Sequence, residues 1–432
     1  MRTAKPERLR RLFSIRGRMH STQSQSWSGQ SAGLADLEFC EQRLKLSWHD
    51  GHVSTFPLRW LVDHSPQHYN TTTGQRTVDT CTIPQKLHAQ AYLQQDTLEV
   101  EWTNNTSGSS ASQDSPYEKS VFELSWLREH CLSEAGRAGR LEPQPPHPVL
   151  WGSELFARGK ATLQHKDLQG EDGVLSLMRV LKTYGIALVR GTTPTMEGTE
   201  EFARRIGAIR QTLYGGMWAT NAEETEVAHS DSAYTNDALG LHTDCAYMTD
   251  PPGLQVFNCM AAAPHGGESL YADGFAIADR LQRESPEAFD FLSTRPLRYV
   301  CKDVGYLLEA AGPVFLLGPA NNVVQFRHND YDRATLDHFS CEDVEAFYAH
   351  HQKLSEIIRD PNMVASIKLL EGDMIIASNQ RTLHGRAAFS GRRRMVGCYV
   401  DRDELESQQR VQGLPSRPYT WHTCSSSPSN GM

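Results

Sequence analysis

The stretch Leu241-His242-Thr243-Asp244 contains a His-x-Asp pair, and His384 lies far downstream in Arg381-Thr-Leu-His-Gly-Arg386. Two imidazoles and one carboxylate can occupy one face of an octahedral Fe(II) ion and leave the opposite face open for substrate and dioxygen. A His-x-Asp pair alone is common, because surface histidines and aspartates are abundant. The pair predicts an oxygen-activating metal site only if the surrounding sequence supports one.

Short apolar runs separated by turn residues surround this pair. Strands are expected at 185–190, 254–259, 269–272, 297–301, 314–317, 323–327, 374–378 and 395–400, and helices at 173–184, 284–292 and 341–359. Many short strands with few helices predict a mainly β catalytic domain with flanking helices, of the double-stranded β-helix (jelly-roll) type.

The sequence upstream of this domain contains a weak internal duplication. Residues 44–64 and 98–130 each combine an alternating strand, a turn, a second strand and a Trp-Leu pair that begins a helical stretch. The Pro-rich residues 142–148 indicate a linker. We therefore expect a small α+β N-terminal domain at 34–149, a catalytic domain at 150–415 and a disordered tail at 416–432.

Residues 1–33 have a different composition. The first 18 residues carry seven Arg and Lys residues against the single acid Glu7, with Leu9, Leu12, Phe13 and Ile15 as an apolar side. A Ser-rich, uncharged segment follows. This composition is typical of a mitochondrial presequence and predicts a protein of the matrix. The alternatives are a disordered basic tail and a cytoplasmic location.

Composition excludes several classes of function. The chain has 432 residues and a formal net charge of -9, which argues against nucleic acid as a partner. The longest apolar runs are too short to span a bilayer, so no membrane partner is expected. Nine cysteines without a Cys-x-x-Cys pair fit a reducing compartment. A homodimer remains possible.

Three consecutive arginines, Arg392, Arg393 and Arg394, follow His384 and lead into a predicted strand. Alternate residues of a strand face opposite sides, so one guanidinium can point inward while its neighbours face solvent. An inward arginine binds a dicarboxylate bidentately. A solvated basic turn accounts for the other two.

Several further segments support this interpretation. They are 208–218 (AIRQTLYGGMW), 232–235 (SAYT), 253–259 (GLQVFNC), 266–270 (GGESL), 273–275 (DGF), 329–333 (NDYDR), 383–386 (LHGR) and 397–399 (GCY). Together with 241–244, they make residues 36–415 resemble the γ-butyrobetaine and trimethyllysine dioxygenase family of Fe(II)/2-oxoglutarate oxygenases. The trimethyllysine side of the family is the better match.

The resemblance implies a role for each matching residue. His242, Asp244 and His384 would bind Fe(2+), while Arg393 and Ser269 would hold the co-substrate 2-oxoglutarate; on chemistry alone Ser269 could equally be an ordinary strand hydroxyl. Ascorbate is expected as a further requirement. The expected reaction is hydroxylation at C3 of N6,N6,N6-trimethyl-lysine, the first step of carnitine biosynthesis, with release of succinate and CO2.

Aromatic residues carry the substrate assignment. Tyr214, Trp218, Tyr234 and Tyr399 match family positions around a quaternary ammonium group, which can be held by cation–π attraction but not by hydrogen bonds. Without the family, such aromatics would more often be core residues. Asp231 and Asn329 are weaker candidates for the polar end of the substrate, and Asp231 could be a turn residue.

Departures from the family pattern keep alternatives open. His64, His68 and Cys81 form an incomplete zinc set where many relatives have cysteines, so no zinc is expected. Ser378 and Gln380 replace an Asp and a Trp, and Cys245 replaces an aromatic residue of γ-butyrobetaine enzymes. The alternatives are a γ-butyrobetaine dioxygenase that makes carnitine, a metal-dependent hydrolase or isomerase on a cupin-like barrel, and a non-catalytic binder of methylated cations.

Overall fold

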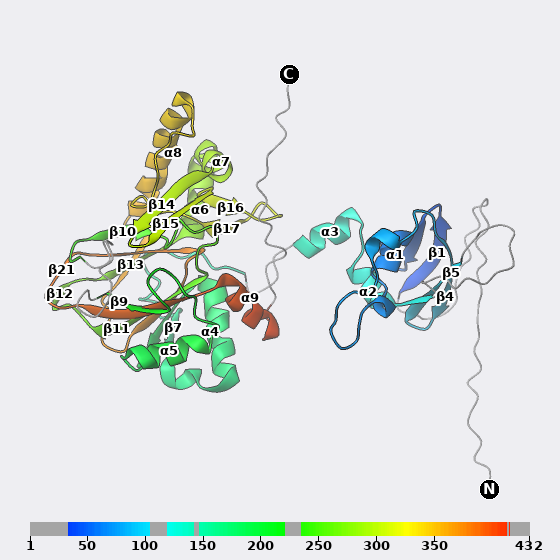
Figure 1. The fold of residues 1–432 in the computed structure, drawn as a ribbon, viewed down its shortest axis with the longest axis horizontal. Coiled ribbons are helices and arrows are strands. Elements are labelled where there is room, and N and C mark those ends of the chain that lie inside the picture. Colours follow the sequence, from blue (N-terminus) through cyan, green and yellow to red (C-terminus); the bar gives the residue numbers. More distant parts are fainter. Residues whose placement is uncertain (1–32, 104–118, 142–146, 221–234, 413, 415–432) are drawn as a thin grey trace, which may run out of the picture. The chain divides into compact units, whose positions relative to one another are not determined.

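The structure is a computed structural model that describes residues 33–103, 119–141, 147–220, 235–412 and 414. The chain divides into two compact units, Met1–Glu142 and Pro143–Met432, and the division falls in the Pro-rich stretch 142–148 (Figure 1). No helix among the described residues is long and apolar enough to cross a membrane. The leader 1–32 and the tail 415–432 lie outside the described residues.

The N-terminal unit consists of two similar halves. The first half contains β1 (Leu34–Cys40), β2 (Arg43–Trp48), β3 (Val53–Pro57) and α1 (Leu58–Asp63), and the second contains β4 (His88–Gln94), β5 (Thr97–Thr103), β6 (Lys119–Glu123) and α2 (Leu124–Glu129), before α3 (Glu134–Leu141). Each half is a three-stranded antiparallel sheet followed by a short helix. One hydrophobic core joins them.

Equivalent side chains make equivalent contacts in the two halves. Trp48 Nε1 donates to Ser54 Oγ at 2.9 Å, and Trp102 Nε1 donates to Ser120 Oγ at the same distance. The two Trp-Leu pairs both lie in the first turn of a helix, and Trp60 and Trp126 pack against each other across the two halves with ring centroids 5.6 Å apart. The predicted duplication is therefore present in the structure.

The catalytic unit is built on two antiparallel β-sheets. The larger sheet contains, in order, β7 (Thr162–Gln164), β8 (Ile186–Arg190), β19 (Met374–Ser378), β11 (Leu254–Ala261), β22 (Arg394–Val400) and β9 (Met217–Ala219), where only β7 and β8 are parallel. The smaller contains β10 (Leu239–His242), β20 (Thr382–Arg386), β13 (Ser269–Asp273) and β18 (Val364–Ile367). The predicted mainly β jelly roll with flanking helices is confirmed.

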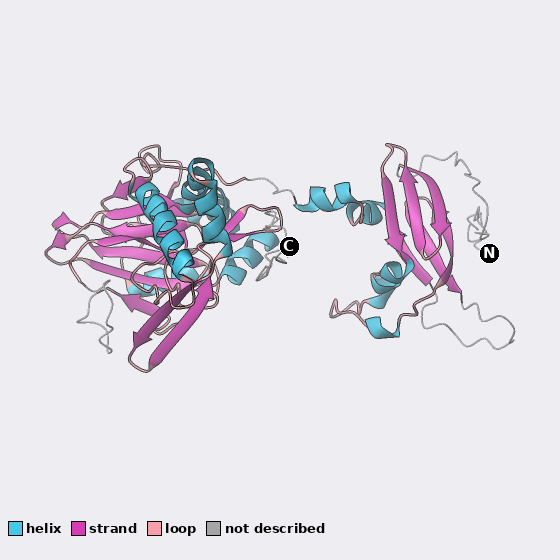
Figure 2. Ribbon diagram, turned by 90° about the horizontal axis from the view of Figure 1, so that it is seen from above, coloured by secondary structure: helices cyan, strands magenta, loops and turns pink. Residues whose placement is uncertain are grey.

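Two-stranded ladders and helices complete the unit. The ladders pair β12 (His265–Gly266) with β21 (Phe389–Ser390), β14 (Leu297–Asp303) with β15 (Tyr306–Gly312), and β16 (Phe315–Leu317) with β17 (Val323–Phe326). The helices are α4 (Gly170–Tyr184), α5 (Met196–Arg204), α6 (Gly274–Glu284), α7 (Pro286–Thr294), α8 (Cys341–Arg359) and α9 (Arg402–Val411). Helices α4 and α5 lie on one side of the strands and α6, α7 and α8 on the other (Figures 1 and 2).

Strand alternation explains this layering. Val256, Ile376 and Cys398 of the larger sheet face outward and pack against α4 and α5. Inward-facing residues of the same sheet, such as Ile375 and Met395, pack against the smaller sheet. Strand residues that alternate between two buried faces are apolar on both, so these runs read as continuous hydrophobic strands.

The structure differs from the sequence prediction at several helix and strand ends, and two of these differences have a clear local cause. The helix expected at 284–292 corresponds to α7, which begins at Pro286 because proline fits the first turn of a helix but cannot continue a preceding one, whereas α6, which ends at Glu284, was not predicted. The strand expected from Gly185 begins at Ile186, since Gly185 has φ 71° and caps α4 in the left-handed conformation.

A buried ion pair connects distant parts of the catalytic unit. The Arg381 guanidinium, just before β20, donates to both carboxylate oxygens of Asp273 at 2.8 Å. It also donates to the carbonyl of Thr183 at 2.9 Å and to that of Val149 at 2.7 Å. These hydrogen-bond acceptors of the buried cation are all carboxylate or carbonyl oxygens, as a buried guanidinium requires.

Candidate active site

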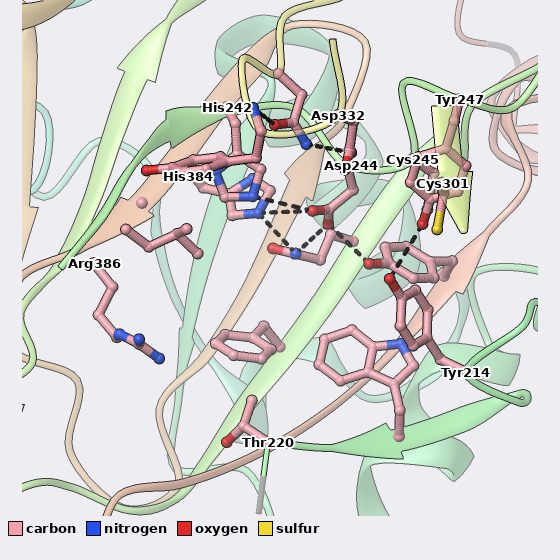
Figure 3. Close-up of a pocket in the computed structure, with 18 of the residues that line it drawn as sticks. Tyr214, Thr220, His242, Asp244, Cys245, Tyr247, Cys301, Asp332, His384 and Arg386 are labelled. Carbon is pink, nitrogen blue, oxygen red and sulfur yellow. Dashed lines mark hydrogen bonds and ion pairs between the residues drawn. The ribbon is translucent and has the colours of Figure 1, made fainter. Parts of the chain in front are cut away.

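His242, Asp244 and His384 come together at the wall of one cavity. His242 of β10 and His384 of β20 are directly opposite each other in an antiparallel pair. Asp244 Oδ1 lies 3.4 Å from His242 Nε2 and 3.2 Å from His384 Nε2 (Figure 3). Three ligand atoms of the right type at these separations fit a single divalent metal ion, so the site passes the geometric test for Fe(II).

The local structure orients these ligand atoms. His242 Nδ1 lies 2.8 Å from the Gly240 carbonyl, and a donated hydrogen bond there leaves the Nε2 lone pair facing the site. The backbone N–H of Asp244 donates to Asn379 Oδ1 at 2.7 Å. Cys245 follows with φ 55°, the left-handed conformation that turns the chain away after the carboxylate.

The second oxygen of Asp244 has its own partners. Gln255 Nε2 donates to Asp244 Oδ2 at 2.5 Å, and the Tyr399 hydroxyl donates to the same oxygen at 3.0 Å. Gln255 and Tyr399 are directly opposite each other on β11 and β22. These two donors leave Oδ1 as the oxygen that faces the histidines.

Charge balance keeps this carboxylate ionised. Burial raises the pKa of Asp244, but the neighbouring His384 and His242 more than offset this and hold it well below its usual range. Burial raises the pKa of the Tyr399 hydroxyl, as does the adjacent Asp244, so this hydroxyl stays protonated and can donate.

Arg393 is a partly buried cation beside the same cavity. It lies in the turn between β21 and β22, one residue before β22 and two before the strand expected at 395–400, and its guanidinium packs 5.8 Å from the Phe257 ring and 5.9 Å from the Phe389 ring. Burial, together with the nearby Arg386, lowers the pKa of Arg393 to about 10, so the group stays charged at neutral pH. Among the described residues it has no acidic partner, and an anionic ligand would supply one.

Ser269 lines the cavity together with Arg393. Ser269 begins β13, is almost fully buried and pairs in register with Arg386 of β20. The Ser269 hydroxyl and the Arg393 guanidinium therefore border one space that can take a carboxylate.

Aromatic rings line the other side of a cavity of about 360 Å³. The Trp218 and Tyr399 ring centroids are 5.5 Å apart, and the Tyr214 hydroxyl lies 3.2 Å from that of Tyr247. Figure 3 shows Tyr214 and Tyr247 together on one side of the cavity. Three of the four predicted cage residues therefore surround one space, and the fourth, Tyr234, lies outside the described residues.

The Trp218 ring depends on a glycine. Gly397 of β22 pairs with Trp218 of β9, and a Cβ atom at residue 397 would lie 2.6 Å from the indole and 2.6 Å from a backbone oxygen. Only glycine lets the indole lie flat over the strand here.

Of the two residues expected to bind the polar end of the substrate, only Asn329 lies among the described residues. Asn329 lines the cavity, donates to Asp332 Oδ2 at 2.7 Å and accepts from the Tyr331 backbone N–H. Asp231 lies outside the described residues. Asp332 and Asp303 also line the cavity, so acidic groups lie near Asn329.

Sequence reasoning missed several of the cavity residues. Gln255, Tyr247, Phe257 and Asp332 were given no role. Gln255 carried a usable signal, because it is a polar residue in the middle of an apolar strand that is buried on both faces.

Known proteins match both units. Residues 141–399 match the model of the Taurine catabolism dioxygenase TauD, TfdA family, and residues 36–109 match that of Gamma-butyrobetaine hydroxylase-like, N-terminal. The chain is 33% identical over 374 residues to the mitochondrial trimethyllysine dioxygenase of Rattus norvegicus, with 84% of each chain covered.

Two further relatives span both branches of this similarity. The mitochondrial trimethyllysine dioxygenase of Gallus gallus is 33% identical over 370 residues, which cover 83% of this chain and 84% of that one. The gamma-butyrobetaine dioxygenase of Pseudomonas sp. (strain AK-1) is 28% identical over 385 residues, which cover 87% and 95%.

Proposed function

Since this chain belongs to the TauD, TfdA dioxygenase family and to its trimethyllysine and γ-butyrobetaine branch, we propose that it hydroxylates C3 of N6,N6,N6-trimethyl-lysine. The products are 3-hydroxy-trimethyl-lysine, succinate and CO2, and the reaction is the first step of carnitine biosynthesis. Fe(II) and 2-oxoglutarate are used by this family; ascorbate is part of the proposal.

One observation carries the proposal. The His242–Asp244–His384 cluster, the partly buried Arg393 and the aromatic rings of Trp218 and Tyr399 all line the same cavity. A keto-acid dianion and a quaternary cation need opposite environments, and this cavity offers both within reach of one metal site.

The cavity residues have separate proposed roles in binding the metal and the co-substrate. His242, Asp244 and His384 would hold Fe(II), and Arg393 and Ser269 would hold the distal carboxylate of 2-oxoglutarate. Bound iron, with 2-oxoglutarate and dioxygen, supplies the oxidising chemistry that converts an unactivated C–H bond to C–OH. Gln255 and Tyr399 keep Asp244 in its ligating orientation.

Substrate placement falls to the aromatic side of the cavity. Faces of Tyr214, Trp218 and Tyr399 would attract the trimethylammonium group, each contributing about 0.5–2 kcal/mol. Asn329, with Asp332 beside it, would bind the amino-acid end. The buried walls exclude water from the space between the two ends.

The metal-dependent hydrolase alternative is weakened by Arg393. A hydrolase needs an activated water and a general base. It has no use for a partly buried guanidinium that lies 5.8 Å from the Phe257 ring at the cavity wall and has no acidic partner among the described residues.

The γ-butyrobetaine alternative is weakened by the comparisons. The trimethyllysine dioxygenases of Rattus norvegicus and Gallus gallus are each 33% identical to this chain, while the γ-butyrobetaine dioxygenase of Pseudomonas is 28% identical. Relatives named mitochondrial, together with the basic leader 1–33, support a mitochondrial location, and we propose the matrix.

A succinate-release assay with a panel of amines tests the substrate. Purified protein with Fe(II), ascorbate and 2-oxoglutarate should release succinate in proportion to added trimethyl-lysine. Lysine should be a poor substrate, because an ammonium group keeps its hydration shell while a trimethylammonium group does not. Faster turnover of γ-butyrobetaine than of trimethyl-lysine would replace the proposal with its alternative.

Tyr399→Phe separates the two contributions of this side chain. The ring remains for the substrate cation, but Asp244 Oδ2 loses a hydrogen bond, so the affinity for Fe(II) should fall by roughly 10–100-fold, as for other residues that orient metal ligands. The KM for trimethyl-lysine should change little. Anaerobic Fe(II) titration and substrate kinetics measure the two effects.

Tyr214→Phe is the matched control, because its hydroxyl contacts Tyr247 and not Asp244. It should leave the affinity for Fe(II) unchanged. Equal losses of Fe(II) affinity in both variants would refute the positioning role of the Tyr399 hydroxyl.

A further inference from the structure

A second cluster of ligand-type side chains lies outside the residues that serve the proposed reaction. His328, Asp330 and His351 each present one nitrogen or carboxylate oxygen, and these atoms all lie within 4.8 Å of one another. His328 and Asp330 follow β17, while His351 lies on α8. The proposed hydroxylation gives none of the three a role.

The contacts of His351 leave one ring nitrogen facing this cluster. Its Nδ1 lies 3.3 Å from Ser355 Oγ, and its Nε2 lies 3.1 Å from Asp330 Oδ1. The Nε2 atom is buried, and no described residue meets it with hydrogen-bond geometry. A ring that donates from Nδ1 to Ser355 directs a lone pair at a carboxylate oxygen, which is repulsive unless a cation lies between them.

His328 adds the second imidazole. Its ring is almost fully buried, and its centroid is 5.6 Å from that of His351. Burial lowers the pKa of His328 to about 4, so the ring is neutral near pH 7, which is the state that binds metals. Burial raises the pKa of Asp330, but contacts with His351 and His328 hold it well below its usual range.

We propose that His328, Asp330 and His351 bind a divalent metal ion of the zinc class, with water as the remaining ligand. Ligand atoms about 2.0 Å from a tetrahedral zinc ion lie about 3.3 Å apart, close to the 3.1 Å between His351 and Asp330. Imidazole ligands favour zinc, cobalt or nickel, whereas magnesium and calcium prefer oxygen ligands. The exposed side of Asp330 gives the ion a path of entry and the water a place.

Arg333 is the competing cation. Its Nε lies 3.4 Å from Asp330 Oδ1, and its guanidinium packs 5.1 Å from the Phe347 ring. A carboxylate has two oxygens, so Arg333 and a metal ion can share Asp330.

The site would connect α8 to the wall of the catalytic cavity. His328 and Asp330 belong to the cluster, while the intervening Asn329 and the following Tyr331 line the cavity. The backbone of His328 exchanges hydrogen bonds with Thr243, between the two proposed iron ligands of β10 and its following turn. A bound ion would therefore restrain the segment that carries the polar end of the substrate site.

Equilibrium dialysis of the metal-free full chain against Co(II) tests the proposal without any activity measurement. Wild-type protein should bind two equivalents. His351→Gln should bind one, and so should His384→Ala, which damages only the proposed iron site. The double variant, which carries both His351→Gln and His384→Ala, should bind none. His350→Gln is the matched control, because its ring packs against Phe291 instead of the cluster, and it should bind two.

Retention of one equivalent by His351→Gln would also show that the variant is folded. Zn(II) should raise the melting temperature of His384→Ala but not that of the double variant, since only a ligand-binding native state is stabilised. Two equivalents bound by His351→Gln, or a single wild-type equivalent that His384→Ala removes, would overturn the proposal. Because these readouts involve no substrate, they are independent of whether trimethyl-lysine is hydroxylated.

Discussion

Replacing His384 with alanine is expected to lower the rate of succinate formation by about 1000-fold or more, equivalent to about 4 kcal/mol of activation free energy. His384 Nε2 lies 3.2 Å from Asp244 Oδ1, and its loss leaves only one imidazole and one carboxylate for the metal. Two ligands cannot define a face of the coordination sphere, so both the affinity for Fe(II) and the reaction geometry are lost. Succinate release and Fe(II) titration measure the two effects.

The fold should survive this change. His384 is partly exposed to the cavity, and its strand neighbours Leu383 and Thr382 supply the buried packing. His338→Ala is the control, since His338 is exposed and does not line the cavity. It should keep full activity. Sustained turnover by His384→Ala, with a normal melting curve, would assign the metal to other side chains.

Arg393→Met is expected to raise the KM for 2-oxoglutarate by about 100-fold, because a carboxylate loses two charge-assisted hydrogen bonds of about 1.5 kcal/mol each. The same change should raise the melting temperature of the protein measured without co-substrate. A partly buried cation that has no acidic partner among the residues the structure describes destabilises the native state, and an apolar side chain of similar length removes that penalty. Steady-state kinetics and calorimetry measure the two effects.

Weaker binding of 2-oxoglutarate together with higher stability would identify Arg393 as a residue that binds the co-substrate. A merely structural arginine would lower the melting temperature when replaced. Arg393→Lys should give an intermediate KM, since an ammonium group keeps the charge but not the bidentate geometry. Arg392→Met, at the exposed neighbouring residue, should leave the KM for 2-oxoglutarate unchanged. A large KM increase in that control would place the co-substrate site elsewhere.

Strand periodicity predicted the scaffold well where both faces of a strand are buried. The apolar runs that became β8, β11, β19 and β22 were all expected, because long β-branched and apolar stretches have few other structures available. The helix at 341–359 was predicted with its observed ends, and Ser340 caps its N-terminus by accepting a hydrogen bond from the Asp343 N–H.

The two strands that carry the histidines were missed. β10 contains Gly240, and β20 contains His384, Gly385 and Arg386, so neither shows the apolar alternation of a strand. Their inward positions hold polar side chains because the proposed metal site, not a hydrophobic core, lies on that side. The local hydrophobic pattern therefore does not predict these two strands, because their inward residues serve the site and not the core.

Sequence motifs predicted which residues form the site but not the hydrogen bonds that hold them in place. His242, Asp244 and His384 were expected from spacing and resemblance, and the structure brings them together. The hydrogen bond from Gln255 to Asp244 could not be predicted, because it depends on the register between β11 and its neighbours. Registers of distant strands are set by tertiary packing and are not written in any short stretch of sequence.

The hydrogen bond from Arg381 to the Val149 carbonyl has a practical consequence for shortened versions of this protein. A chain cut to begin at residue 151 would keep every strand of both catalytic sheets. It would nevertheless lack the Val149 carbonyl, so one N–H group of the enclosed Arg381 guanidinium would lose its acceptor. Arg381 directly precedes β20, the strand that contains His384. An expression boundary for the catalytic unit therefore belongs upstream of residue 147, inside the Pro-rich connection, and not at the first helix or strand.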